Sequence, residues 1–178
     1  HIQQAITMAS KITYPRALRD ESVVDDYHGR KVKDAYRALE DPDSDVTKEW
    51  VKQQQEVFDT LKQEFKYREV FAEKTKEMRN YPRYGTPFKE GKNYFYFFNE
   101  GLQNQDVLYI LGDSLDNPRK VFIDPNTWAA DGTASMGTYS FSRPDGKYIA
   151  YCVHKSGSDW NTISIKNVET GEVLAEEL

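Results

Sequence analysis

The chain has 178 residues, 38% of them hydrophobic and 13% aromatic, and a formal net charge of -5. This length suits one domain with room for part of a second. So mild a charge gives no electrostatic footprint for nucleic acid or an anionic membrane, and we expect neither as a partner.

Cys152 is the only cysteine, so no disulfide can form within the chain. This fits a reducing compartment, and we expect a cytoplasmic protein in which Cys152 is a buried strand residue. No apolar run approaches the ~20 residues of a membrane span. The start, His1-Ile2-Gln3-Gln4, lacks the features of a signal peptide, and Met8 is a candidate natural start.

A helical pattern runs from Asp43 to about Met78. Asp43 or Ser44 is suited to cap the first helix, where an oxygen accepts from free backbone N–H groups. Apolar residues then recur at spacings near seven and four, which predicts one apolar stripe. The stripe consists of Trp50, Val57, Leu61 and Phe65. A second short helix is predicted with one side made of Tyr67, Val70 or Phe71, Lys74 and Met78, ended by Asn80-Tyr81-Pro82.

From Tyr84 onward the period changes to two, which predicts strands separated by glycine and proline turns. The first set of predicted strands covers residues 93–98, 107–111 and 121–123. The second set covers residues 135–142, 148–154 and 162–168, and a last short strand begins at Val173-Leu174.

The two sets of strands resemble each other. Each has an aromatic-rich strand and then a polar loop that ends in an aspartate, Asp106 or Asp159. Tyr94 and Tyr148 are fifty-four positions apart, and the two aspartates are fifty-three apart. Four-stranded repeats of this period are typical of β-propeller blades, and a propeller needs about four to eight of them. We therefore expect these two units to be part of a larger propeller.

Ten short motifs in one order resemble the prolyl oligopeptidase family of serine peptidases. They are Tyr14-Pro15, residues 25–29 (DDYHG), 39–44 (LEDPDS), 81–84 (YPRY), 94–97 (YFYF), 101–105 (GLQNQ), 107–109 (VLY), 124–126 (DPN), 131–133 (DGT) and 157–160 (GSDW). The resemblance covers nearly the whole chain from Tyr14 on.

The resemblance implies a mixed fold: an N-terminal helical wrap of an α/β-hydrolase domain, followed by the first antiparallel blades of a seven-bladed β-propeller. Residues 1–80 would pack on the peptidase domain, and residues 81–178 would form two blades, about Tyr81–Phe122 and Ala134 onward. The parent protein would be a serine endopeptidase that cleaves short peptides after proline, with the propeller as a gating filter. Its partners would be proline-containing peptides and the remainder of the same polypeptide, and no cofactor is expected.

In this family the serine, aspartate and histidine of the triad lie far toward the C-terminus. The resemblance therefore implies no catalytic, cofactor-binding or metal-binding residue in this chain, which alone is expected to be inactive. A peptide ligase or macrocyclase of the same family is an alternative, and an autonomous propeller-type binding module is a third.

The family's proline and tryptophan are replaced here by Ala35 and Ala38. An emptied tryptophan pocket would cost on the order of 3–5 kcal/mol, so either a neighbour fills that space or the substitution is engineered.

A different pattern also contains a serine. Gly112-Asp113-Ser114-Leu115 follows a predicted strand, as in GDSL esterases, and His28 in an Asp-x-x-His would be the base for Ser114. The order of the two blocks is reversed, and Pro118 blocks the helix that should follow, so we favour a hairpin turn at Ser114 and a structural role for His28 near a turn.

His1, His28 and His154 have no metal spacing. Asp159 is interpreted as satisfying N–H groups of its loop, with a domain contact as the alternative.

Overall fold

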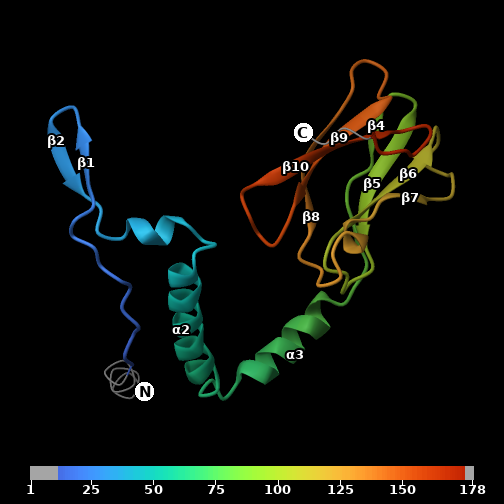
Figure 1. The fold of residues 1–178 in the computed structure, drawn as a ribbon. Coiled ribbons are helices and arrows are strands. Elements are labelled where there is room, and N and C mark those ends of the chain that lie inside the picture. Colours follow the sequence, from blue (N-terminus) through green and yellow to red (C-terminus); the bar gives the residue numbers. More distant parts are fainter. Residues whose placement is uncertain (1–11, 175–178) are drawn as a thin grey trace. The chain divides into compact units, whose positions relative to one another are not determined.

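The structure is a computed structural model that describes residues 12–174. The chain divides into two units, residues 1–70 and 71–178, and each is described by itself. Along the chain, a small hairpin is followed by two helices and then by antiparallel strands (Figure 1). The interpretations of His1–Gln4 and Met8 lie outside the described residues.

The first unit begins with an antiparallel hairpin of β1 (Val24–Tyr27) and β2 (Arg30–Lys33), which the sequence patterns did not predict. Its turn is formed by His28 and Gly29, with φ angles of 55° and 88°. Two-residue turns of positive φ are favoured in hairpins because their twist matches that of the strands. His28 therefore has the structural position at a turn that was expected of it.

An ionic cluster joins this hairpin to the 3-10 turn η1 (Arg37–Glu40). The guanidinium of Arg37 contacts the carboxylates of Asp34, Asp25 and Glu40. Hydrogen bonds to Asp34 and Asp25 hold the pKa of Arg37 above its usual value. The cluster fixes η1 against β1.

Helix α2 spans Asp45–Lys62. Ser44, and not Asp43, caps it: the Ser44 Oγ accepts from the Thr47 N–H at 3.3 Å. Thr47 is the one buried residue of α2, and its hydroxyl donates to the carbonyl of Ala38 at 3.1 Å. Ala38 itself is exposed, so the position of the family's tryptophan lies on the surface of the described residues.

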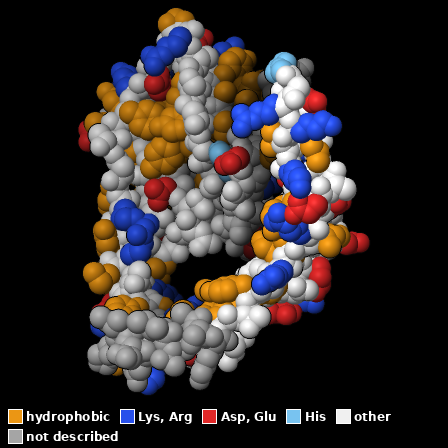
Figure 2. All heavy atoms as spheres, turned by 90° about the vertical axis from the view of Figure 1, so that its left-hand side faces the viewer, with side chains coloured by type: hydrophobic (Ala, Val, Ile, Leu, Met, Phe, Trp, Pro, Cys, Tyr) orange, Lys and Arg blue, Asp and Glu red, His pale blue; other side chains and the backbone are white. Residues whose placement is uncertain are grey.

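The predicted apolar stripe of α2 is only partly covered. Trp50, Val57 and Leu61 are half-buried, and the indole N–H of Trp50 donates to the carbonyl of Pro15 at 3.3 Å. Phe65 was wrongly included in this stripe, because the helix ends at Lys62, and the Phe65 side chain is 57% exposed. Hydrophobic side chains remain on the molecular surface among charged ones (Figure 2).

Helix α3 spans Arg68–Arg79 and crosses the boundary between the two units. It ends directly before Asn80, as predicted. None of its residues is buried among the described residues, and Phe71 and Met78 are 71% and 75% exposed. The apolar side predicted for this helix is therefore open.

The first sheet contains five strands, two more than the three predicted for this part of the chain. They are β3 (Arg83–Tyr84), β4 (Phe88–Glu90), β5 (Asn93–Asn99), β6 (Val107–Gly112) and β7 (Lys120–Ile123). The order is β3-β5-β6-β7, and β4 pairs with the other end of β5 on the same edge as β3. The sequence did not predict β3 and β4 because Gly85 and Pro87 interrupt this outer strand, and proline cannot donate to a ladder.

The second sheet has the order β10-β9-β8. Its strands are β8 (Ser135–Phe141), β9 (Tyr148–His154) and β10 (Asn161–Asn167), within one residue of their predicted bounds. The predicted fourth strand is a single bridge from Val173 to Lys166 among the described residues. Cys152 lies in β9 as predicted, but it is half-buried and not fully buried.

The core of this unit lies between the two sheets. Alternation along β5 directs Phe95 and Phe97 to this core and Tyr96 and Phe98 to the opposite face, since successive side chains of a strand point to opposite sides. The buried core residues are Phe95, Leu108, Phe122, Ile123, Phe141, Ile149, Tyr151 and Val168. Phe95 is fully buried, and its ring centroid lies 4.8 Å from that of Phe141 in the other sheet.

Candidate functional site

Ser114, the serine of the esterase-like pattern, lies in the turn between β6 and β7. Its Oγ accepts from the backbone N–H of Asp116 at 3.2 Å. Within residues 12–174, no hydrogen bond joins Ser114 to a histidine, and His28 lies in the hairpin turn of the other unit. A hydroxyl that fixes a turn and has no base beside it is not arranged as a nucleophile.

The loop from Lys155 to Trp160 connects β9 to β10. It is closed by Ser158, whose Oγ accepts from the Trp160 N–H at 3.1 Å. The side chain that accepts from this loop N–H group is Ser158. Asp159 was expected to do so, but its side chain is exposed, and the expectation was wrong for the Trp160 N–H. Trp160 is 89% exposed. Tryptophan is one of the residue types enriched at protein contact surfaces.

A buried amide organises the loop between β5 and β6. Asn99 is 1% exposed, and its Nδ2 donates to the carbonyl of Gln103 at 3.1 Å and to the carboxylate of Asp106 at 3.0 Å. Its Oδ1 accepts from the Gly101 N–H at 2.8 Å. The first aspartate of the repeat is thus a structural residue, because it accepts from a buried amide that has no water to bond.

Asn126 connects the same loop to the chain that leads into the second sheet. It belongs to the 3-10 turn η2 (Pro125–Thr127). Its Oδ1 accepts from the Gln105 N–H at 2.9 Å, and its Nδ2 donates to the Gln105 carbonyl at 3.0 Å. One side chain thereby satisfies both backbone groups of Gln105 and fixes the loop beside η2.

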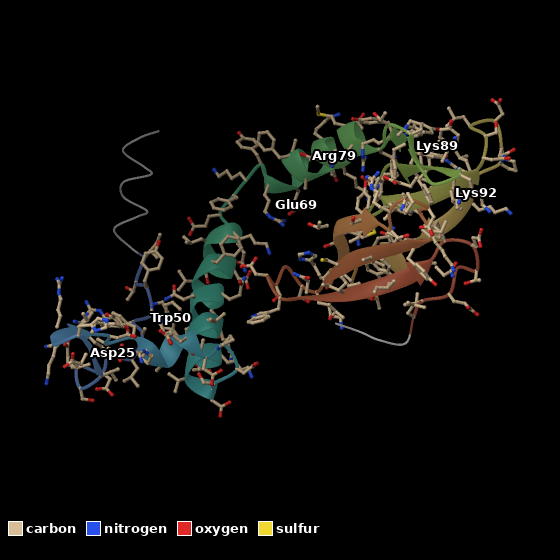
Figure 3. The ribbon with its side chains drawn as sticks, turned by 90° about the horizontal axis from the view of Figure 1, so that it is seen from above. Asp25, Trp50, Glu69, Arg79, Lys89 and Lys92 are labelled. Atoms are coloured by element: carbon tan, nitrogen blue, oxygen red, sulfur yellow. The ribbon has the colours of Figure 1, made fainter. Side chains whose placement is uncertain are left out.

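A cleft of about 450 Å³ opens beside these two loops, between the two sheets and the end of α3. Its walls are formed by Arg79, Arg83, Phe97, Asn104, Gln105, Asp106, Pro125, Met136, Gly137 and Tyr139. Arg79 extends from the last turn of α3 beside the sheets (Figure 3). The sequence did not indicate this cleft, because its walls come from segments up to sixty positions apart.

Two arginines make the cleft electropositive. The Nη1 of Arg83 donates to the carbonyls of Arg79 at 3.1 Å and Gly101 at 2.9 Å, which holds this guanidinium in place. Neither Arg79 nor Arg83 is paired with a carboxylate among the described residues. The one acidic residue in the walls, Asp106, already accepts from Asn99.

The outer face of the first sheet carries a second cluster, made of aromatic rings around Arg119. The Arg119 Cζ lies 4.1 Å from the ring centroid of Phe98 and 4.9 Å from that of Tyr109. A hydrogen bond to the Tyr96 hydroxyl raises the pKa of Arg119. Tyr84 on this face is 68% exposed. Both faces of β5 are therefore rich in aromatic residues, as in a strand that is covered on both sides.

No group of three or more histidine, cysteine or acidic side chains within residues 12–174 is arranged to hold a metal ion. In the same part of the chain, no helix combines the length and the apolar character needed to cross a membrane.

Comparison with known proteins gives the family. A family model described as prolyl oligopeptidase, N-terminal beta-propeller domain, matches residues 15–178. The prolyl endopeptidase of Elizabethkingia meningoseptica is 35% identical over 167 residues, which cover 94% of this chain and 23% of the relative.

Solved structures agree with this result. A structure from a study of two prolyl endopeptidases and their inter-domain dynamics has a TM-score of 0.75 at 29% identity, over 93% of this chain and 24% of that one. Prolyl oligopeptidase B from Galerina marginata, bound to a 35mer hydrolysis and macrocyclization substrate, has a TM-score of 0.69 at 31% identity, over 93% and 26%. The chain spans about a quarter of the length of these relatives. The resemblance seen in the sequence is confirmed: the chain belongs to the prolyl oligopeptidase family, and residues 15–178 match its N-terminal β-propeller domain.

Proposed function

We propose that this chain is the N-terminal part of a serine endopeptidase that cleaves short peptides after proline. The observation that carries the proposal is the match of residues 15–178 to the family's propeller domain, in a chain that covers a quarter of its relatives. The catalytic triad belongs to the remainder of the polypeptide, and this chain supplies no catalytic residue.

Two parts of the chain have different tasks in this proposal. Residues 1–80 pack on the α/β-hydrolase domain, and residues 81–178 form blades one and two of the propeller. The partly covered stripe of α2 and the open apolar side of α3 support the first assignment, because helices in proteins gain most of their stability from a packed apolar face. The two sheets around one aromatic core support the second.

The exposed pair Asp159 and Trp160 is proposed to contact the catalytic domain. Propeller blades one and two would then help to gate access of peptides to a buried site, in which a histidine takes the serine proton and backbone N–H groups hold the oxyanion. The cytoplasmic location expected from the single cysteine stays a prediction.

Hydrolysis of a Gly-Pro reporter substrate tests the proposal. We expect turnover by the full-length protein and none by residues 1–178 alone. Turnover by the isolated chain that survives repurification and disappears in Ser114→Ala would refute the proposal and favour the esterase-type interpretation. Co-expression of the chain with its remainder should restore activity and a monomer-like complex together.

A peptide macrocyclase is the second candidate. The likeness to Galerina marginata prolyl oligopeptidase B favours it, since that protein is described with a macrocyclization substrate. The two activities differ in product mass: hydrolysis adds one water, whereas cyclisation leaves the excised segment without it. Mass spectrometry of the products from a 25–35-residue substrate of the kind bound by that relative would separate the two.

A propeller-type binding module is disfavoured by the structure of the sheets themselves. Two blades leave an unpaired strand edge and an aromatic outer face, and such edges recruit other strands. We expect the isolated chain to self-associate in sedimentation, and a cooperative monomer would favour the module.

A further inference from the structure

The cleft beside α3 is lined by two cations, Arg79 and Arg83, and by one carboxylate, Asp106. Arg79 and Arg83 both line it, and among the described residues neither is within ion-pair distance of a carboxylate. Asp106, the acidic residue of the walls, is engaged by the buried amide of Asn99 at 3.0 Å. The charged groups of the walls sum to +1, and this favours a bound anion.

The two arginines are prepared for this task in different ways. Arg83 has its Nη1 fixed by two backbone carbonyls, at 3.1 Å and 2.9 Å, so little side-chain freedom remains to be lost on binding. Arg79 makes no side-chain hydrogen bond within residues 12–174, so its planar fork of donors is open to a ligand.

We propose that this cleft binds the carboxylate of a peptide. Guanidinium groups match a carboxylate in a forked geometry. The apolar walls formed by Phe97, Pro125 and Met136 suit the side chain next to that carboxylate. The proposal rests on the proposed peptidase function for its choice of a peptide as the ligand.

The walls favour a carboxylate over a phosphate group. The walls carry two guanidinium groups and one carboxylate, a net charge of +1, which a monoanion balances and a dianion exceeds. A volume of about 450 Å³ holds one or two residues of a peptide end and not a long segment. A terminal carboxylate is therefore the ligand that the charge and the size of the cleft fit together.

Calorimetric titration of the full-length protein tests this with two probes, N-acetylated Gly-Phe-Leu as the free acid and the same peptide as its C-terminal amide. Neither probe contains proline, so binding is measured without cleavage. We expect the acid to bind about tenfold tighter than the amide, and this preference to fall as salt is raised. Arg79→Gln should reduce the preference to about threefold or less. Arg143→Gln, at an exposed arginine away from the cleft, should keep it.

Equal affinity for acid and amide in the unchanged protein would overturn the proposal. So would an equal effect of Arg79→Gln and Arg143→Gln. Equal peptide binding together with a lower melting temperature in Arg79→Gln would instead mean that the arginines neutralise a carboxylate of the protein itself. The proposed peptidase function is tested separately. If the full-length protein does not hydrolyse the Gly-Pro reporter but still prefers the acid probe, the peptidase function is refuted and the carboxylate site is supported.

Discussion

The sheets of residues 83–167 and the segment of residues 12–62 differ in where their apolar side chains lie. In the sheets, Phe95 and Ile149 are fully buried, and Leu108 is 1% exposed. In the N-terminal segment, the one buried residue among those described is Thr47, while Phe58 in α2 is 51% exposed. The sheets thus build a core of their own, and the N-terminal segment has the amphipathic pattern of a helix without the surface that would cover it.

This difference separates local from long-range causes of structure. The hairpin of β1 and β2, the cap at Ser44 and the cluster around Arg37 hold the N-terminal segment through neighbours close in sequence. The core between the sheets joins residues about fifty positions apart, such as Phe95 and Phe141. Because isolated helices are marginal in water, we expect the N-terminal segment to be the part whose stability depends on a partner.

The largest effect is expected from truncating the core. Phe95→Ala should lower the free energy of unfolding of residues 1–178 by about 3–5 kcal/mol, because it leaves a cavity among packed rings. The matched Phe58→Ala should cost less than about 1 kcal/mol in this chain and more once the remainder is joined. Urea unfolding checks both, and equal losses in the isolated chain would contradict the comparison.

Substituting one glycine in each region tests the comparison between the sheets and the N-terminal segment further. Gly91 has a φ of +58°, and an added Cβ would lie 2.1 Å from the carbonyl oxygen of Asp145, at the contact between the turns of the two sheets. Gly91→Ala should cost about 2–6 kcal/mol, since overpacking and a positive φ each cost about 1–3 kcal/mol. Gly29 has a φ of +88° with nothing near its added Cβ, so Gly29→Ala should cost about 1 kcal/mol. Thermal unfolding measures both, and a larger loss at Gly29 would be inconsistent with this explanation.

Removing the buried amide should loosen one loop. Asn99→Ala leaves the Gly101 N–H and the Gln103 carbonyl without their partner, which costs about 1–3 kcal/mol. Amide exchange in residues 100–106 should speed up, with β9 unchanged. Uniform acceleration across both sheets would instead mean that Asn99 supports the whole unit.

The smallest effect concerns the surface ion pair of Lys92 and Glu169, whose charged atoms are 2.7 Å apart and which joins the two sheets. The hydrogen bond to Lys92 lowers the pKa of Glu169 below its usual 4.5, so the pair's contribution is complete above that pH and is lost as pH falls through the lowered pKa. Glu169 raises the pKa of Lys92 above its usual 10.5. The contribution is therefore also lost as pH rises through this raised pKa. NMR titration of Glu169 should give a higher pKa in Lys92→Gln, and an unchanged pKa would mean the pair does not persist in solution.

The sequence predicted the elements with strong periodicity. The strand pattern at residues 93–98 and the helix start near Ser44 were confirmed, because alternation and capping depend on neighbours along the chain. Short polar strands such as β1 and β2 were missed, since their pairing depends on the His28-Gly29 turn more than on hydrophobic pattern. The break before Phe65 was missed because the apolar spacing continues past the end of the helix.

The cleft could not be predicted from the sequence. Arg83 was noted in a motif, but its proximity to Tyr139 and Met136 depends on the packing of two sheets. The aspartate repeat was visible, yet Asp106 accepts from a buried amide and Asp159 is exposed. The two aspartates at equivalent positions of the repeat thus have different roles, because tertiary contacts decide which side chains are buried.

The measurement that tests the central claim most directly is amide hydrogen exchange of residues 1–178, alone and joined to the C-terminal remainder. The claim is that the N-terminal segment is completed by that remainder, whereas the sheets pack on themselves. We predict that joining slows exchange in α2 and α3 by at least about tenfold and leaves the central strands β5 and β9 nearly unchanged. Equal protection of α2 and α3 in the two samples would contradict the claim.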